Sequence, residues 1–246
     1  MPRDPAVSAL AVAWGGAAVF AASLIWFVYS YVVRFEALAA ASGVPTTAAW
    51  LRPAALDVLL FSIFALHHSV FARSGAKAVV LKTVPPYLER SVYTWVASVL
   101  FLLVCTLWQP VPGTLYRLDG AWRAGGYALQ VVGLLLTVHA SRLLDVLDLA
   151  GVRPVEQASR RDAPAHVPLE TGGVYGFVRH PLYFAWALFV FAAPSMTGTR
   201  VVFAVVSTAY LALAIPLEER ALVAAFGDEY RAYQRRVRWR MVPGLY

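Results

Sequence analysis

Apolar blocks of about 20 residues alternate with short polar segments along this 246-residue chain. A helix of that length crosses the ~30 Å hydrocarbon layer of a bilayer. The first block carries no charge and is too long for the core of a signal peptide, so we expect an uncleaved span. The pattern predicts an all-α, polytopic integral membrane helical bundle with spans at residues 5–33, 54–72, 92–108, 124–141, 182–199 and 201–217.

The last two blocks are separated by the turn-forming sequence MTGTR, at residues 196–200, and predict an antiparallel helical hairpin with arms of nearly equal length. If the hairpin crosses fully, the chain has six spans. If it only dips into the bilayer, five spans remain. In both cases the hairpin returns the C-terminal tail to the side that it left.

The tail sequence EERALVAAFGDEYRAYQRRV predicts an amphipathic helix. Its apolar residues are spaced by four, four, three and four positions, which places them on one helix face: Leu222, Phe226, Tyr230, Tyr233 and Val237. One interpretation is an interfacial helix whose arginines touch lipid headgroups. In that case the two glutamates before it complement the dipole of its first turn.

Composition supports a membrane protein whose partner is the lipid bilayer. The chain is 60% hydrophobic and 14% charged, whereas a soluble domain carries about 25% charge. With six spans, all but five of its 21 Lys and Arg residues fall on one side, the exceptions being Arg34, Arg52, Arg117, Arg123 and Arg200. The positive-inside rule makes that side cytosolic. We expect a bacterial-type inner membrane, both termini in the cytosol and no nucleic-acid partner for the net charge of +7.

The single cysteine and the long connection at residues 143–177 limit the chemistry further. Because Cys105 is the only cysteine, the chain forms no intrachain disulfide and no multi-cysteine metal site, and we expect no metal. The residue lies inside an apolar block. The connection has mixed charge, prolines and a Gly-Gly pair. It therefore predicts a cytosolic loop, and loops of this length are often lids or binding loops.

The stretch GFVRHPLYFAWALFVF places a cation and an imidazole at the mouth of an apolar helix. Its proline suits the first helical turn, so Arg179 and His180 fall at a helix N-terminus, which favours an anion. The hairpin then returns Glu218 and Glu219 to the level of Arg179, His180 and Tyr183. The sequence thus predicts a polar cluster at the cytosolic edge of the membrane.

Two parts of the chain resemble known membrane enzymes. GGVYGFVRHPLYFAW and LEERALVAAFGDEYRAYQRRVRW resemble the C-terminal signature of the membrane methyltransferases that include isoprenylcysteine carboxyl methyltransferase and the phospholipid methyltransferases. LHHSVFARSGAKAVVLKTVPPYLERSVYTWVASVL is similar to the corresponding part of the methanethiol S-methyltransferase family and of NnrU-related proteins. The resemblance covers most of the chain from about residue 56.

This resemblance implies an S-adenosylmethionine site facing the cytosol. By its motif, the cofactor-binding residues would be Gly173, Tyr175, Arg179, His180, Tyr183, Glu218 and Glu219. Residues 1–142 would form the acceptor side, and residues 143–246 the loop, hairpin and tail that build the cofactor site. The chemistry agrees, since the cofactor offers a carboxylate to arginine, an ammonium to carboxylates and a sulfonium to aromatic faces.

The reaction implied is methyl transfer to a small lipophilic thiol, with methanethiol the first candidate, giving dimethyl sulfide and S-adenosylhomocysteine. A thiol must react as the thiolate. A cation such as Arg179 or Arg238 would lower the pKa of the thiol, or a histidine would take its proton. His67, His68 and Tyr93 are the catalytic candidates of the first half, although helix-packing hydrogen bonds are a simpler role for membrane histidines.

Two alternatives stay open. The first is methylation of an isoprenylated cysteine or a phospholipid. The second belongs to another class, since NnrU-related proteins include a haem-dependent isomerase. In that case iron ligands would come from His67, His68, His139 and His180.

Overall fold

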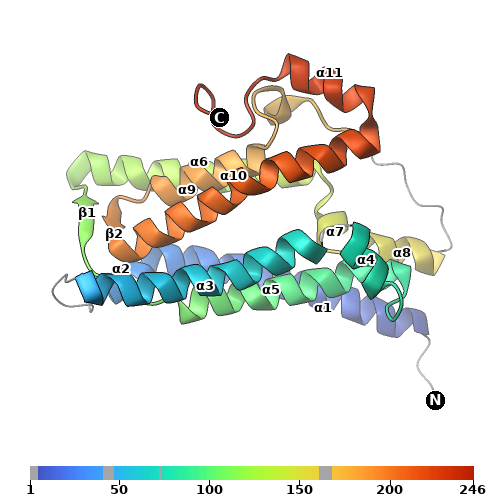
Figure 1. Cartoon of the computed structure of the whole chain (residues 1–246), viewed down its shortest axis with the longest axis horizontal. Helices are drawn as coiled ribbons and strands as arrows, with labels where there is room; N and C mark the ends of the chain where they lie inside the picture. The colour runs from blue at the N-terminus through green and yellow to red at the C-terminus, as the bar shows by residue number, and fades with distance from the viewer. Residues whose placement is uncertain (1–4, 41–46, 72–73, 161–167) are drawn as a thin grey trace. The chain divides into compact units, whose positions relative to one another are not determined.

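A computed structural model describes residues 5–40, 47–71, 74–160 and 168–246 (Figure 1). In these ranges five helices are long and apolar enough to cross a membrane, which confirms the all-α membrane class: Val7–Ala40, Ala49–Phe71, Pro86–Leu107, Gly120–Leu143 and Gly198–Phe226. The predicted end of the second span at Ala72 lies just outside the described residues.

The chain forms two compact units. Unit 1 comprises Met1–Val33, Leu56–Trp108 and Asp145–His166, and unit 2 comprises Arg34–Ala55, Gln109–Leu144 and Val167–Tyr246. The division of function at residue 142 is a different boundary, and it stays a prediction.

Unit 1 is built around the packing of α1 on α5. Its described elements are α1 (Pro5–Tyr29) with the start of the π-helical turn η1 (Ser30–Arg34), most of α3 (Thr47–Phe71), α4 (Ser74–Val80), the 3-10 turn η2 (Pro86–Leu88), α5 (Glu89–Leu107), α7 (Val146–Leu149) and α8 (Arg153–Arg160). The indole of Trp95 lies against Gly15 and Gly16, where a Cβ would approach it to 2.9 Å. Its Nε1 donates to the Val12 carbonyl at 2.8 Å, so the two glycines admit the ring that joins the helices.

The predicted long loop is partly helical. Helices α7 and α8 lie within it, and the Ser91 hydroxyl on α5 donates to the Gly151 carbonyl between them at 2.6 Å. Arg90 forms an ion pair with Asp148 at 3.1 Å. The first half of this connection is therefore a folded part of unit 1.

Unit 2 contains α2 (Phe35–Ala40), β1 (Thr114–Arg117), α6 (Gly120–Leu143), the 3-10 turn η3 (Gly173–Gly176), α9 (Pro181–Phe191), β2 (Ser195–Thr197), α10 (Gly198–Phe226) and α11 (Asp228–Arg236). Helices α6 and α9 lie side by side (Figure 1). At Gly133 a Cβ would lie 3.0 Å from the Ala185 carbonyl oxygen, so a side chain there would push the two helices slightly apart. The Gln130 amide donates to the Phe189 carbonyl at 3.1 Å and fixes the pair.

The prediction of equal hairpin arms is wrong. Helix α9 has 11 residues, or about 16 Å, whereas α10 has 29. The first arm ends early because Pro194 cannot continue a helix, and Ser195–Thr197 instead pairs antiparallel with β1. Helix α9 is too short to span the bilayer alone and is not among the five long helices.

The tail is not one helix starting at the glutamates. Glu218 and Glu219 lie inside α10, which continues to Phe226, so the first-turn interpretation of these residues is wrong. Gly227, with φ of +57°, then turns the chain into α11. This positive φ favours glycine at the break.

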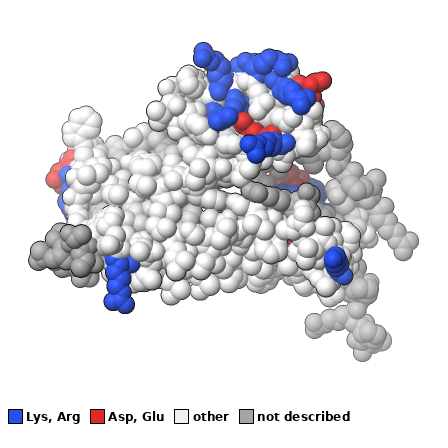
Figure 2. Space-filling model, viewed as in Figure 1, with Lys and Arg blue, Asp and Glu red and all other residues white. Residues whose placement is uncertain are grey.

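The apolar face of the tail packs inside unit 2. Tyr230, Tyr233 and Val237 are buried in a cluster with Ala140 and Tyr175. Figure 2 shows Lys and Arg gathered over α11 and the segment after it, where Arg231, Arg235, Arg236 and Arg238 are exposed. The predicted apolar face therefore exists, and its residues Tyr230, Tyr233 and Val237 pack against protein.

A second polar cluster lies at the start of α10. Glu36 pairs with Arg200 at 2.5 Å and with Arg117 at 2.9 Å, and it accepts a hydrogen bond from the Ser195 hydroxyl at 3.2 Å. Arg200 also donates to the Ser195 carbonyl at 2.7 Å. These contacts join α2, β1, β2 and α10.

Candidate functional site

A buried ion pair forms the centre of the predicted cluster. Arg179, just before α9, donates from Nε to Glu219 Oε1 on α10 at 2.6 Å. Its Nη1 donates to the carbonyls of Val237 and Arg238 at 2.6 and 3.0 Å. Arg179 and Glu219 are only 8% and 4% exposed. The guanidinium is thus committed to one carboxylate and two backbone carbonyls.

The backbone after α11 runs alongside this pair. The Arg179 amide donates to the Trp239 carbonyl at 3.0 Å, and the His180 amide donates to the Arg240 carbonyl at 2.8 Å. Residues 237–240 therefore hold the Arg-His motif in place through main-chain atoms.

Glu219 contacts residues from several elements. Besides Arg179, its oxygens lie 3.4 Å from His180 Nε2, 3.2 Å from the Gln234 amide nitrogen and 3.5 Å from Arg240 Nε. The anion expected beside Arg179 and His180 is thus supplied by the protein itself.

Glu218, next in sequence, has a different environment. Its Oε2 accepts a hydrogen bond from the Tyr183 hydroxyl at 2.8 Å and lies 3.6 Å from His180 Nδ1. The rings of His180 and Tyr183 stack with centroids 5.3 Å apart. The Glu218 side chain is 44% exposed, so it can bind a cation from solution.

A pocket of about 230 Å³ lies beside this cluster within unit 2. It is lined by Leu144, Pro168, Leu169, Glu170, Tyr175, Arg179, His180, Pro181, Leu182, Tyr183, Glu218, Leu222, Phe226, Tyr230 and Tyr233. Five of the seven predicted cofactor-binding residues are in this lining, and Gly173 and Glu219 are not. Gly173 is exposed at the start of η3, with φ of +49°.

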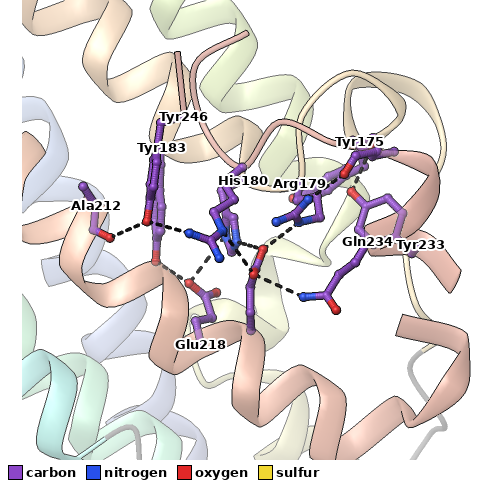
Figure 3. Close-up of polar contacts among 12 residues, drawn as sticks. Tyr175, Arg179, His180, Tyr183, Ala212, Glu218, Tyr233, Gln234 and Tyr246 are labelled. Atoms are coloured by element: carbon purple, nitrogen blue, oxygen red, sulfur yellow. Dashed lines mark hydrogen bonds and ion pairs between the residues drawn. The ribbon is translucent and has the colours of Figure 1, made fainter. Parts of the chain in front are cut away.

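Sequence reasoning did not assign Tyr230 and Tyr233 to the site. Their apolar helical spacing was the available signal, but one interpretation of it was an interfacial helix. The Tyr233 hydroxyl donates to the Tyr175 carbonyl at 2.7 Å (Figure 3). Among the described residues, the buried hydroxyls of Tyr175 and Tyr230 have no hydrogen-bond partner.

Burial keeps these phenols neutral. It raises the pKa of Tyr175 and of Tyr230 well above the usual value of 10. Burial likewise raises the pKa of Tyr233 to about 12. Each phenol therefore keeps its proton at neutral pH and can donate a hydrogen bond.

The catalytic candidates of the first half meet inside unit 1. The Tyr93 hydroxyl lies 2.8 Å from His68 Nδ1, and the Tyr93 ring stacks on His67 with centroids 5.5 Å apart. Arg238 belongs to unit 2, where its exposed guanidinium lies over the Trp239 ring at 5.7 Å. The catalytic roles of these four residues stay predictions.

The fold and the site define a multi-pass helical membrane protein with a polar and aromatic pocket beside α10. The chain belongs to the family described as "Protein of unknown function (DUF1295)", which matches residues 75–237. No solved structure matches the chain.

Three relatives of this chain are named as methyltransferases. A methanethiol S-methyltransferase of Crocosphaera subtropica is 37% identical over 74% of this chain and 72% of the relative. Methanethiol S-methyltransferase 2 of Bradyrhizobium diazoefficiens is 35% identical over 78% and 73%. A more distant protein-S-isoprenylcysteine O-methyltransferase of Dictyostelium discoideum is 29% identical over 49% and 52%.

Proposed function

We propose that this protein is an integral membrane methyltransferase that transfers the methyl group of S-adenosylmethionine to methanethiol, giving dimethyl sulfide. The observation that carries the proposal is the pocket beside Arg179 and Glu219, which lies within the family match at residues 75–237, in a chain similar to relatives named methanethiol S-methyltransferase. The pocket lies at the proposed cytosolic face of a bacterial inner membrane.

The chemistry of the lining fits S-adenosylmethionine. The exposed carboxylate of Glu218 suits an ammonium, and the stacked rings of His180 and Tyr183 offer an aromatic face to a sulfonium. Leu222 and Phe226 supply apolar surface for a purine. At about 230 Å³ the pocket is below the ~300 Å³ usual for small-molecule sites, so it encloses only part of such a ligand.

The buried Glu219 and the exposed Glu218 have different roles in this proposal. Glu219 holds Arg179 and Arg240, and thereby fixes the wall of the pocket. Glu218 faces the ligand. The cofactor supplies an electrophilic methyl group when bound, and the protein contributes by alignment and exclusion of water.

On the acceptor side, we propose that His67, His68 and Tyr93 assist removal of the thiol proton. Their mutual contacts support this proposal, since Tyr93 and His68 share a hydrogen bond that orients the imidazole. Arg238 is the proposed cation that favours the thiolate.

Headspace gas chromatography tests the reaction. Membranes containing the protein, supplied with S-adenosylmethionine and methanethiol, should release dimethyl sulfide. Glu218→Gln should reduce the rate at least tenfold, whereas Arg235→Ala, an exposed change outside the pocket, should leave it unchanged. Dimethyl sulfide release that does not depend on S-adenosylmethionine would refute the proposal.

A second acceptor class is favoured by the relative named isoprenylcysteine O-methyltransferase. The same membranes can be supplied with a farnesylated cysteine analogue. Methylation of this analogue in place of methanethiol would select the second class. The haem alternative is disfavoured at His180, because its two ring nitrogens lie 3.4 and 3.6 Å from glutamate oxygens.

A further inference from the structure

We propose that the hydroxyls of Tyr175 and Tyr230 donate hydrogen bonds to the adenosine part of the bound cofactor and make the pocket selective for it. This inference rests on the proposed function, and it assigns a new role to Tyr230 and to the hydroxyl of Tyr175.

The hydroxyls of Tyr175 and Tyr230 lack hydrogen-bond partners among the described residues, whereas a neighbouring phenol of the same pocket has one. Tyr175 and Tyr230 are 7% and 1% exposed, both line the pocket, and neither hydroxyl has a partner among the described residues. A buried donor without a partner is destabilising, so native proteins rarely keep one without a reason. Tyr233, which lines the same pocket, does have an acceptor at 2.7 Å.

Other side-chain donors of the lining already have acceptors. Arg179 donates to Glu219 and to two backbone carbonyls. Tyr183 donates to Glu218, whose exposed carboxylate remains an acceptor. The unused donors in the described part of the lining are thus the two neutral phenols.

A neutral acceptor suits these phenols better than a charged one. They belong to a cluster with Ala140, Val237 and partly buried leucines, and a carboxylate placed there would need a compensating cation. Purine nitrogens and ribose hydroxyls are neutral acceptors, and a purine also stacks on aromatic rings. The adenosine part of the cofactor combines both properties, whereas its amino-acid part does not.

The proposal predicts effects of opposite sign on stability and on binding. A phenylalanine at either position removes a donor that has no partner in the ligand-free protein, so thermal stability should stay the same or rise. The same change removes a hydrogen bond to the ligand, so affinity should fall.

Calorimetric titration of the purified full-length protein tests this. Tyr175→Phe and Tyr230→Phe should each weaken binding of S-adenosylhomocysteine about 3- to 10-fold. Binding of 5′-methylthioadenosine, which lacks the amino-acid part, should weaken by the same factor when measured by competition. Tyr233→Phe is the matched control, and it should lower the thermal midpoint because it breaks the bond to the Tyr175 carbonyl.

The outcomes separate this inference from the function on which it rests. If the unaltered protein does not bind S-adenosylhomocysteine, the proposed function fails. If it binds and both variants bind within twofold of it, only this inference is overturned. It is also overturned if 5′-methylthioadenosine binding is unaffected, or if the variants lower the midpoint as much as Tyr233→Phe does.

Discussion

The two polar clusters on α10 each contain an ion pair between an arginine and a glutamate, but the contacts around these pairs differ. Each pairs an arginine that is at least nine-tenths buried with a glutamate, Arg200 with Glu36 and Arg179 with Glu219. Arg200 and Glu219 are 19 positions apart, or about 28 Å along the helix, so the clusters fall near its opposite ends.

Around Arg200 the contacts link secondary-structure elements to one another. Glu36 binds two arginines and a serine from β1, β2 and α10. Around Arg179 the same kind of ion pair forms the wall of a pocket that also contains unsatisfied hydroxyls. Because both clusters contain such an ion pair, our proposal of a binding site rests on the pocket and its unsatisfied hydroxyls, not on the ion pair.

The largest expected effect is at Glu219. Glu219→Gln leaves the buried Arg179 without a neutralising charge, and we expect a loss of about 3–5 kcal/mol in the free energy of unfolding. Thermal unfolding in detergent measures this. A midpoint equal to that of the unaltered protein would show that Glu219 is not the structural centre of the cluster.

Arg200→Met tests the other cluster. The change removes the ion pair between Glu36 and Arg200. The side chain of Glu36 is 29% exposed and still pairs with Arg117, so we expect a smaller loss of about 1–3 kcal/mol in the free energy of unfolding. Binding of S-adenosylhomocysteine by the folded variant should match that of the unaltered protein. A tenfold weaker affinity would contradict the separation of the two clusters.

A smaller effect is expected at Gln234. Gln234→Ala removes one hydrogen bond to Glu219, of 3.2 Å, while the ion pair with Arg179 remains. We expect a loss of about 1 kcal/mol in stability. If the loss equals that of Glu219→Gln, the network acts as one indivisible unit.

The smallest change in stability is expected at Glu218. Its side chain is 44% exposed, so Glu218→Gln should change the free energy of unfolding by less than about 0.5 kcal/mol. Its affinity for S-adenosylhomocysteine should nevertheless fall, because the carboxylate faces the pocket. Calorimetric titration beside Glu219→Gln would therefore separate the roles of two adjacent glutamates.

Hydrophobic spacing was sufficient to predict the class of fold and the meeting of distant residues. Arg179, His180, Tyr183 and Glu218 lie together as the hairpin predicted, although its arms are unequal. The apolar composition of this stretch fits a short helix as well as a long one, so it does not fix the length of the first arm. The early end of α9 depends on Pro194 and on strand pairing with β1, which is a long-range contact that local spacing does not contain.

The tail shows a second limit of sequence patterns. An apolar helix face at Leu222, Phe226 and Tyr230 looks the same whether it meets lipid or protein. Only the packing of these residues around Tyr175 assigns them to the pocket. Likewise, adjacent glutamates differ in burial because successive residues on a helix point about 100° apart, and the sequence does not say which one faces inward.

The contacts of Arg179 with residues 237–240 also have a consequence for biosynthesis. Its carbonyl acceptors lie 58 and 59 positions later in the chain. During synthesis at about 5–20 residues per second, the arginine emerges several seconds before these acceptors exist. Glu219 neutralises the arginine and is made first, but until Arg238 has been made the guanidinium lacks two of its three acceptors, so the final geometry of the site forms only after nearly the whole chain has been synthesised.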